Sequence, residues 1–83
     1  METKEALAQY EEVFEEIARL RDQYSALYDK IVTLASDEGV CLNLELSIAA
    51  NNVVEVMRES ENSMYNTQDA INTVTIGLKR ELA

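Results

Sequence analysis

The chain has 83 residues, of which 16 are acidic and seven are basic, so its formal net charge is −9. It contains no proline, no histidine and only two glycines. A chain of this length forms one domain at most, residues 1–83. All-β folds need more turn residues than this, so the composition predicts a few long helices. The negative charge argues against direct binding of nucleic acid or anionic membranes, because both are recognised by Lys and Arg.

A long amphipathic pattern begins near Thr3 and extends to about residue 36. Its apolar side chains recur every seven residues in three adjacent rows. The first row is Ala6, Val13, Leu20, Leu27 and Leu34, the second is Leu7, Phe14, Tyr28 and Ala35, and the third is Tyr10, Ile17, Tyr24 and Ile31. Only Arg21 interrupts this face, either to fix the helix register, to reach a carboxylate of a partner, or to extend its guanidinium past Tyr24 to the rim. Three rows exceed the two that a two-stranded coiled coil needs, so we expect helix 3–36 to pack in a bundle.

The segment Asp37-Glu38-Gly39 predicts a turn over residues 37–42. Gly39 is expected to cap the first helix in the left-handed conformation, unless Ser36 or Asp37 caps the next helix instead. Residues 40–48 alternate between apolar and polar, which is typical of a strand, but their apolar residues also fit helical spacing. We favour the helix, because no second alternating segment is available to pair with a strand. Cys41, the only cysteine, is interpreted as a small buried apolar residue near the turn.

A second helix is predicted over about residues 43–82. Its rows are Ala50, Met57, Met64, Ile71 and Leu78; Val53, Ser60, Thr67 and Val74; and Ala49, Val56, Ser63, Ala70 and Gly77. The continuous seven-residue spacing favours a single helix, although Asn66 or Thr67 could cap a new one after a break near 61–67. The row of small residues would let a neighbouring helix approach closely.

Together these elements predict an all-α fold, an antiparallel hairpin of two long amphipathic helices. Each helix then has one neighbour but a face about 100° wide, which a single neighbour does not cover. We therefore expect homodimerisation to complete a four-helix bundle. The expected self-association interface consists of Leu7, Tyr10, Phe14, Ile17, Leu20, Tyr24, Leu27, Tyr28, Ile31, Leu34, Val53, Met57, Met64, Ile71 and Leu78.

Residues that usually carry catalysis are scarce. Without histidine the chain forms no Ser-His-Asp or Cys-His arrangement, and it has no glycine-rich phosphate loop or calcium-loop motif. We expect no enzymatic activity and no cofactor. Glu11, Glu12, Glu15 and Glu16 form an acidic surface that is interpreted as a solvated helix face, with a weak cation site as the alternative. The same surface is the expected contact for a basic protein partner.

The leading functional hypothesis is a non-catalytic helical interaction module. It would self-associate and bind another protein, as a small acidic adaptor or chaperone, with the polar middle of the second helix as a further contact surface. The alternative is an acidic inhibitor that imitates nucleic acid and occupies the basic groove of a nucleic-acid-binding protein. The N-terminus lacks signal-peptide features, and no apolar segment approaches the roughly 18 residues of a membrane span, so we expect a cytoplasmic protein.

Overall fold

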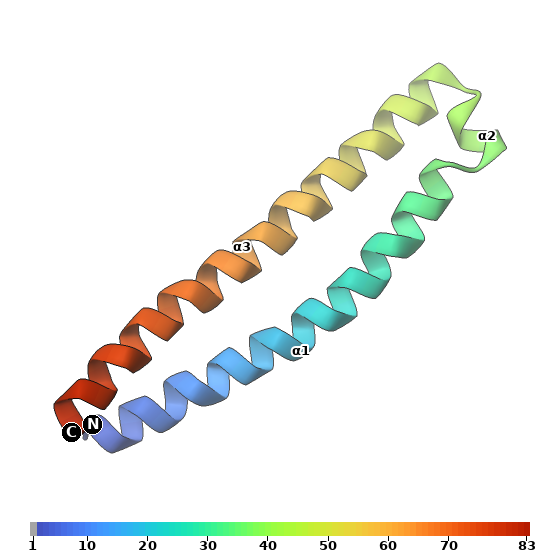
Figure 1. The fold of residues 1–83 in the computed structure, drawn as a ribbon. Helices are drawn as coiled ribbons and strands as arrows, with labels where there is room; N and C mark the ends of the chain where they lie inside the picture. Colours follow the sequence, from blue (N-terminus) through green and yellow to red (C-terminus); the bar gives the residue numbers. More distant parts are fainter. Residues whose placement is uncertain (1) are drawn as a thin grey trace.

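The structure, a computed structural model, describes residues 2–83. It consists of α1 (Thr3–Ala35), α2 (Glu38–Cys41) and α3 (Leu44–Leu82). Figure 1 shows that α1 and α3 lie side by side and antiparallel, with the two termini together at one end and α2 at the other. The hairpin measures 60 × 17 × 16 Å. The predicted all-α hairpin is therefore confirmed.

The connection between the long helices contains two side-chain caps. The Asp37 carboxylate accepts a hydrogen bond from the Gly39 amide at 3.1 Å and thereby caps the N-terminus of α2. The Asn43 side chain accepts one from the Leu46 amide, also at 3.1 Å, and begins α3. The expected left-handed cap at Gly39 was wrong, because no glycine among the described residues has a positive φ. Asp37 caps the next helix instead, as the alternative held.

The two ambiguous segments are helical apart from Leu42 and Asn43, which connect α2 to α3. Val40 and Cys41 belong to α2, and α3 begins at Leu44, so the strand alternative for residues 40–48 was wrong. Helix α3 continues through residues 61–67, so the possible break does not occur. The expectation that Cys41 is buried was also wrong. Its side chain is exposed, because α2 forms the end of the molecule and packs against other elements on one side only.

Two rows of side chains from each helix form the seam, the contact between α1 and α3. On α1 these are the rows that contain Phe14 and Ile17. On α3 the Ala50 row lies beside a mostly polar row that the sequence analysis did not place inside. This polar row comprises Ser47, Val54, Glu61, Gln68 and Thr75. Among the described residues, the buried side chains are Ile71, Gln68 and Thr75, each 4–8% exposed, so the core of this hairpin is narrow and partly polar.

None of the helices within residues 2–83 combines the length and the apolarity that crossing a membrane would require.

Candidate interaction surfaces

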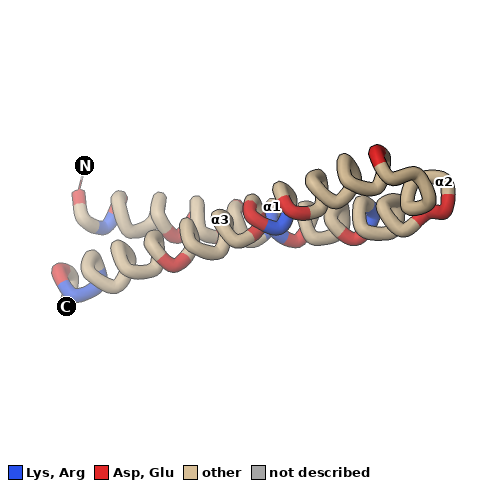
Figure 2. The backbone as a smooth tube through the Cα atoms, turned by 90° about the horizontal axis from the view of Figure 1, so that it is seen from above, with Lys and Arg blue, Asp and Glu red and all other residues tan. Residues whose placement is uncertain are grey.

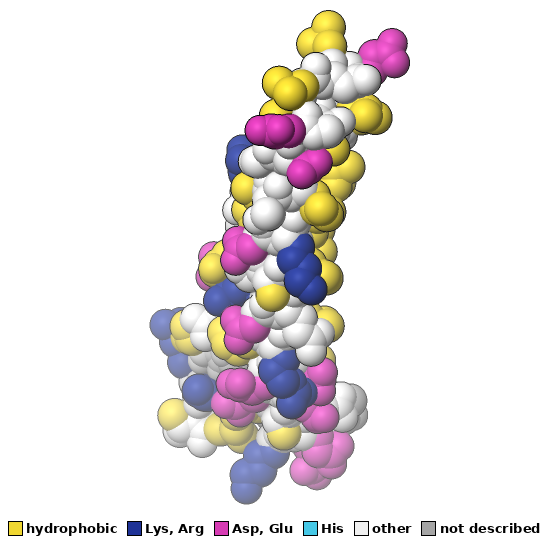
Figure 3. All heavy atoms as spheres, turned by 90° about the vertical axis from the view of Figure 1, so that its right-hand side faces the viewer, with side chains coloured by type: hydrophobic (Ala, Val, Ile, Leu, Met, Phe, Trp, Pro, Cys, Tyr) yellow, Lys and Arg dark blue, Asp and Glu magenta, His cyan; other side chains and the backbone are white. Residues whose placement is uncertain are grey.

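The first row of α1, here named the leucine row, is left uncovered by α3. It comprises Ala6, Val13, Leu20, Leu27 and Leu34. Leu20, Leu27 and Leu34 are 53%, 52% and 61% exposed. The cause is geometric, because two rows fill the contact with a single neighbour and a third row falls to its side. In Figure 3, which views the hairpin edge-on, hydrophobic side chains gather along the upper part of the right-hand edge.

The leucine row shares one side of the hairpin with the Val53 row of α3, which comprises Val53, Ser60, Thr67 and Val74. Near the termini, a groove is lined by Ala6, Gln9, Tyr10, Val13 and Ile71. Near α2, a second groove is lined by Ile31, Leu34, Ala35, Val40, Ala50 and Val53. Leu34 and Val53 thus border the same depression from opposite helices. The two rows together form a continuous surface, the apolar face, which contains no charged residue.

The middle of the apolar face is polar by residue type but satisfied in its hydrogen bonding. The hydroxyl of Ser60 donates to the carbonyl oxygen of Val56 at 3.0 Å, and that of Thr67 donates to Ser63 at 2.8 Å. The neighbouring Ser63 hydroxyl donates to the backbone carbonyl oxygen of Glu59 at 3.1 Å. Each hydroxyl proton already has an acceptor within α3. Covering these side chains with another molecule therefore leaves no hydrogen-bond donor without a partner. This region therefore behaves as a shallow, small-residue part of the apolar face.

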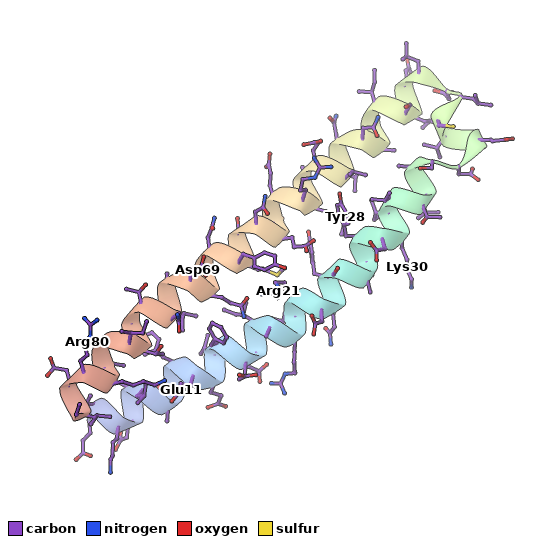
Figure 4. The ribbon with its side chains drawn as sticks, in the orientation of Figure 1. Glu11, Arg21, Tyr28, Lys30, Asp69 and Arg80 are labelled. Atoms are coloured by element: carbon purple, nitrogen blue, oxygen red, sulfur yellow. The ribbon has the colours of Figure 1, made fainter. Side chains whose placement is uncertain are left out.

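The opposite side of the hairpin, the polar face, is bridged by hydrogen bonds between the helices. Arg21 crosses from α1, stacks over the Tyr65 ring at 3.9 Å and donates from Nη1 to Gln68 Oε1. Gln68 in turn donates from Nε2 to the carbonyl oxygen of Phe14 at 3.3 Å. Figure 4 shows Arg21 between the two helices. Arg21 interrupts the apolar pattern because it meets the polar row of α3, not because it extends past Tyr24 to the rim.

A second bridge on this side is exposed. Arg58 donates from Nη2 to the Tyr28 hydroxyl at 3.4 Å and forms an ion pair with Glu55 at 3.2 Å. The hydrogen bond to Tyr28 and the charge of Glu55 raise the pKa of Arg58 above its ordinary value, so the guanidinium stays charged. Both bridges join α1 to α3 within one chain.

The acidic surface predicted at Glu11, Glu12, Glu15 and Glu16 is exposed throughout. Glu11 and Glu15 border a groove on the polar face that Asn72, Thr75 and Lys79 line from α3. Glu16 pairs with Arg19 on the same helix. Across residues 2–83, no three acidic or cysteine side chains converge in the way that a metal ion would need.

The structure divides the residues of the expected self-association interface into two groups. Leu7, Phe14, Ile17, Tyr24, Tyr28, Ile31, Met57, Met64, Ile71 and Leu78 are partly or fully buried, whereas Tyr10, Leu20, Leu27, Leu34 and Val53 are exposed. The first group packs in the seam or at its edge. Only the second group is largely available to another molecule.

A further apolar cluster lies at the tip, residues 36–46. Leu42 and Leu44 are 81% and 76% exposed, the highest values among the large exposed apolar side chains of the described chain. Three acidic residues accompany them, Asp37, Glu38 and Glu45. Sequence reasoning treated this segment only as a question of helix or strand. The signal that could have identified it as a surface is the concentration of leucines around a turn.

In comparisons with known proteins, no family model, no curated protein and no solved structure matches this chain. A functional proposal therefore rests on the chemistry of the two faces and the tip.

Proposed function

We propose that the protein is a non-catalytic helical interaction module that homodimerises through its apolar face into a four-helix bundle and binds another protein, as a small acidic adaptor or chaperone. The observation that carries the proposal is the exposure of the leucine row, where Leu20, Leu27 and Leu34 are more than half accessible. Three large apolar side chains aligned over two heptads form a surface that water solvates poorly.

Energetics favour covering this face. Fully burying a large apolar side chain contributes about 1.5–3 kcal/mol, so covering one that is already about half buried contributes about half as much, and a symmetric dimer counts each residue twice. The leucine row, together with Val53 and Val74, therefore supplies a gain of about the same size as the entropic cost of association. The satisfied hydroxyls of Ser60 and Thr67 remove the penalty that unpaired polar groups would impose in the middle of the interface.

Analytical ultracentrifugation tests the self-association, with Leu27→Asp as the disrupting variant. We expect the wild-type protein to sediment at twice its 9.4 kDa mass at micromolar concentration. Leu27→Asp should weaken dimerisation at least about 100-fold, because two buried leucines become two buried carboxylates. Circular dichroism should show that the variant keeps its helices, since Leu27 is exposed in the single hairpin.

Val32→Asp is the matched control. Val32 lies on the same helix, is 38% exposed, and stands on the flank of α1 opposite the leucine row. It introduces the same charge, so a loss of dimerisation confined to Leu27→Asp assigns the interface to the apolar face. A wild-type chain that remains monomeric at 100 μM would refute the proposal.

The binding of a second protein is supported by two acidic surfaces that lie outside the apolar face and would stay accessible in a dimer. The acidic tip and the glutamates of α1 lie outside it and carry much of the net charge. Immobilised wild-type protein and a Leu42→Asp, Leu44→Asp variant should be compared in a pull-down from the source cells. A partner retained by the wild type and lost by the dimeric variant would assign the contact to the tip.

A further inference from the structure

We infer that the second copy lies on the apolar face in the reversed direction, so that its tip is beside the termini of the first copy and α1 packs on α1. The inference rests on the proposed self-association and adds the orientation of the partner. It also implies that the dimer presents its two tips at opposite ends.

The first argument is the near-palindromic order of the two exposed rows. On α3, Val53 and Val74 flank two hydroxyl residues, Ser60 and Thr67, so the row reads the same in both directions by residue size. The four larger residues of the leucine row behave similarly. Reversal about the point midway between Leu20 and Leu27 pairs Leu20 with Leu27 of the second copy, and Val13 with Leu34, while Ala6 lies beyond the paired positions. A twofold axis that runs across the helices places each row against the same row of the second copy. Large residues then meet large ones, and small residues meet small ones.

The second argument is that one axis serves both rows. Contacts across the polar face place Tyr28 level with Arg58, and Arg21 level with Tyr65. The midpoint between Leu20 and Leu27 is therefore level with residues 62–63 of α3. The midpoint between Ser60 and Thr67 differs from this by one residue, or about 1.5 Å along the axis. A symmetric dimer requires this coincidence, which the pattern of either helix alone would not produce.

Small side chains at the centre of the α3 row allow the two copies of α3 to approach closely there. The hydroxyls of Ser60, Ser63 and Thr67 are bonded to their own helix, so this approach leaves no donor unpaired. The leucines of the two α1 helices would interdigitate at a wider separation. In the reversed orientation the two α1 helices are therefore farther apart, with leucines between them, and the two α3 helices are closer together, with small residues between them.

Charge provides a third, independent argument. Residues 31–57, which include the tip, contain four acidic residues and no basic one. The opposite end is close to neutral, because Lys4, Lys79 and Arg80 there are balanced by Glu2, Glu5 and Glu81. Figure 2 shows acidic segments at the α2 end, and both signs of charge beside the termini. Reversal places each acidic tip beside this nearly neutral end of the other copy, whereas a parallel arrangement would place two acidic tips together.

Cys41 permits a direct measurement, because it is the only cysteine and its side chain is exposed at the tip. A spin label at Cys41 in the dimer should give a single distance by double electron–electron resonance. Reversed copies place the two labels about 50–60 Å apart, whereas parallel copies place them within about 25 Å, from the helix rise and interhelix spacing.

A heterodimer experiment provides the converse measurement. One copy is labelled at Cys41, and the other at a cysteine introduced by Lys4→Cys in a Cys41→Ser background. Reversed copies bring these two positions within about 25 Å, and parallel copies separate them by about 50 Å. A short Cys41–Cys41 distance in a dimer would overturn the orientation and leave self-association intact. A monomer by sedimentation would overturn both the orientation and the proposed function.

Discussion

The two long sides of this hairpin differ in where their interactions are satisfied. On the polar face, Arg21, Gln68, Tyr65, Tyr28 and Arg58 join α1 to α3 within one chain. On the apolar face, the hydroxyls bond only to their own helix, and the leucines extend into solvent. The polar face specifies how one chain folds on itself. The apolar face leaves a surface whose burial requires a second molecule.

This difference has a thermodynamic consequence. Contacts within the seam and on the polar face stabilise a single chain by an amount independent of concentration. Contacts made by the apolar face in a dimer contribute stability that rises with protein concentration, because association is linked to folding. Substitutions on the two sides should therefore be distinguishable by repeating one unfolding measurement at two concentrations.

The largest effect is expected in the seam. Ile71 is 8% exposed and is the one apolar residue of the described chain that is classed as buried. Replacing it with alanine should lower the free energy of unfolding by about 2–4 kcal/mol, because the cavity adds to the lost transfer energy. Urea unfolding followed by circular dichroism measures the loss. Ile76→Ala, at a position 44% exposed, is the control and should lose less than about 1 kcal/mol. Equal losses would show that the seam is not the core.

How far the sequence predicts this fold can be judged from these same positions. The seven-residue spacing that contains Ile71 predicted the helix, its inward row and the hairpin. It did not predict which two of three rows form the seam, because all three rows of α1 are apolar. The choice depends on the partner helix, whose second inward row contains Glu61, Gln68 and Thr75. A hydropathy pattern assigns such residues to the surface, so the polar core was missed.

The candidate surfaces were predicted less well for a related reason. Leu20 and Tyr24 both belong to the apolar rows of α1 in the sequence, yet Leu20 is exposed and Tyr24 is partly buried. Only the packing of α3 separates them. At the turn, Asp37 was correctly considered as a cap because an Asx side chain offers a local acceptor. The exposure of Leu42 and Leu44 could not be predicted from the sequence. It arises because α1 ends at Ala35 and does not extend alongside the first residues of α3.

The next largest effect is expected at Gln68, whose substitution tests whether the buried bridge between α1 and α3 stabilises the polar face. Gln68 is 4% exposed and contacts both Arg21 and the backbone of Phe14. Gln68→Ala should cost about 1–3 kcal/mol, because it removes an acceptor from a charged donor in a partly buried site. Gln68→Glu keeps an acceptor for Arg21 and should cost less. The losses should be the same at 2 and 200 μM protein, in urea titrations at both concentrations.

The loss of stability caused by Leu27→Ala should, in contrast, depend on protein concentration. Leu27 is about half exposed in the hairpin, so its truncation should cost under about 1 kcal/mol where the protein is monomeric. At concentrations where the protein is dimeric, the loss should increase and the wild-type melting temperature should rise relative to the variant. Thermal unfolding across a hundredfold concentration range measures both. A loss that is independent of concentration would place Leu27 in intramolecular contacts only.

The smallest effect is expected at Arg58, and it separates buried from exposed bridges on the same face. Its contacts with Tyr28 at 3.4 Å and with Glu55 at 3.2 Å are both exposed to solvent. Exposed pairs of this kind contribute little to stability, so Arg58→Ala should lower the melting temperature by less than about 4 °C. Adding 1 M NaCl should reduce even that shift. If Arg58→Ala proved as damaging as Gln68→Ala, the polar face would be held by its exposed rim, and the assignment of Gln68 as the central bridge would be wrong.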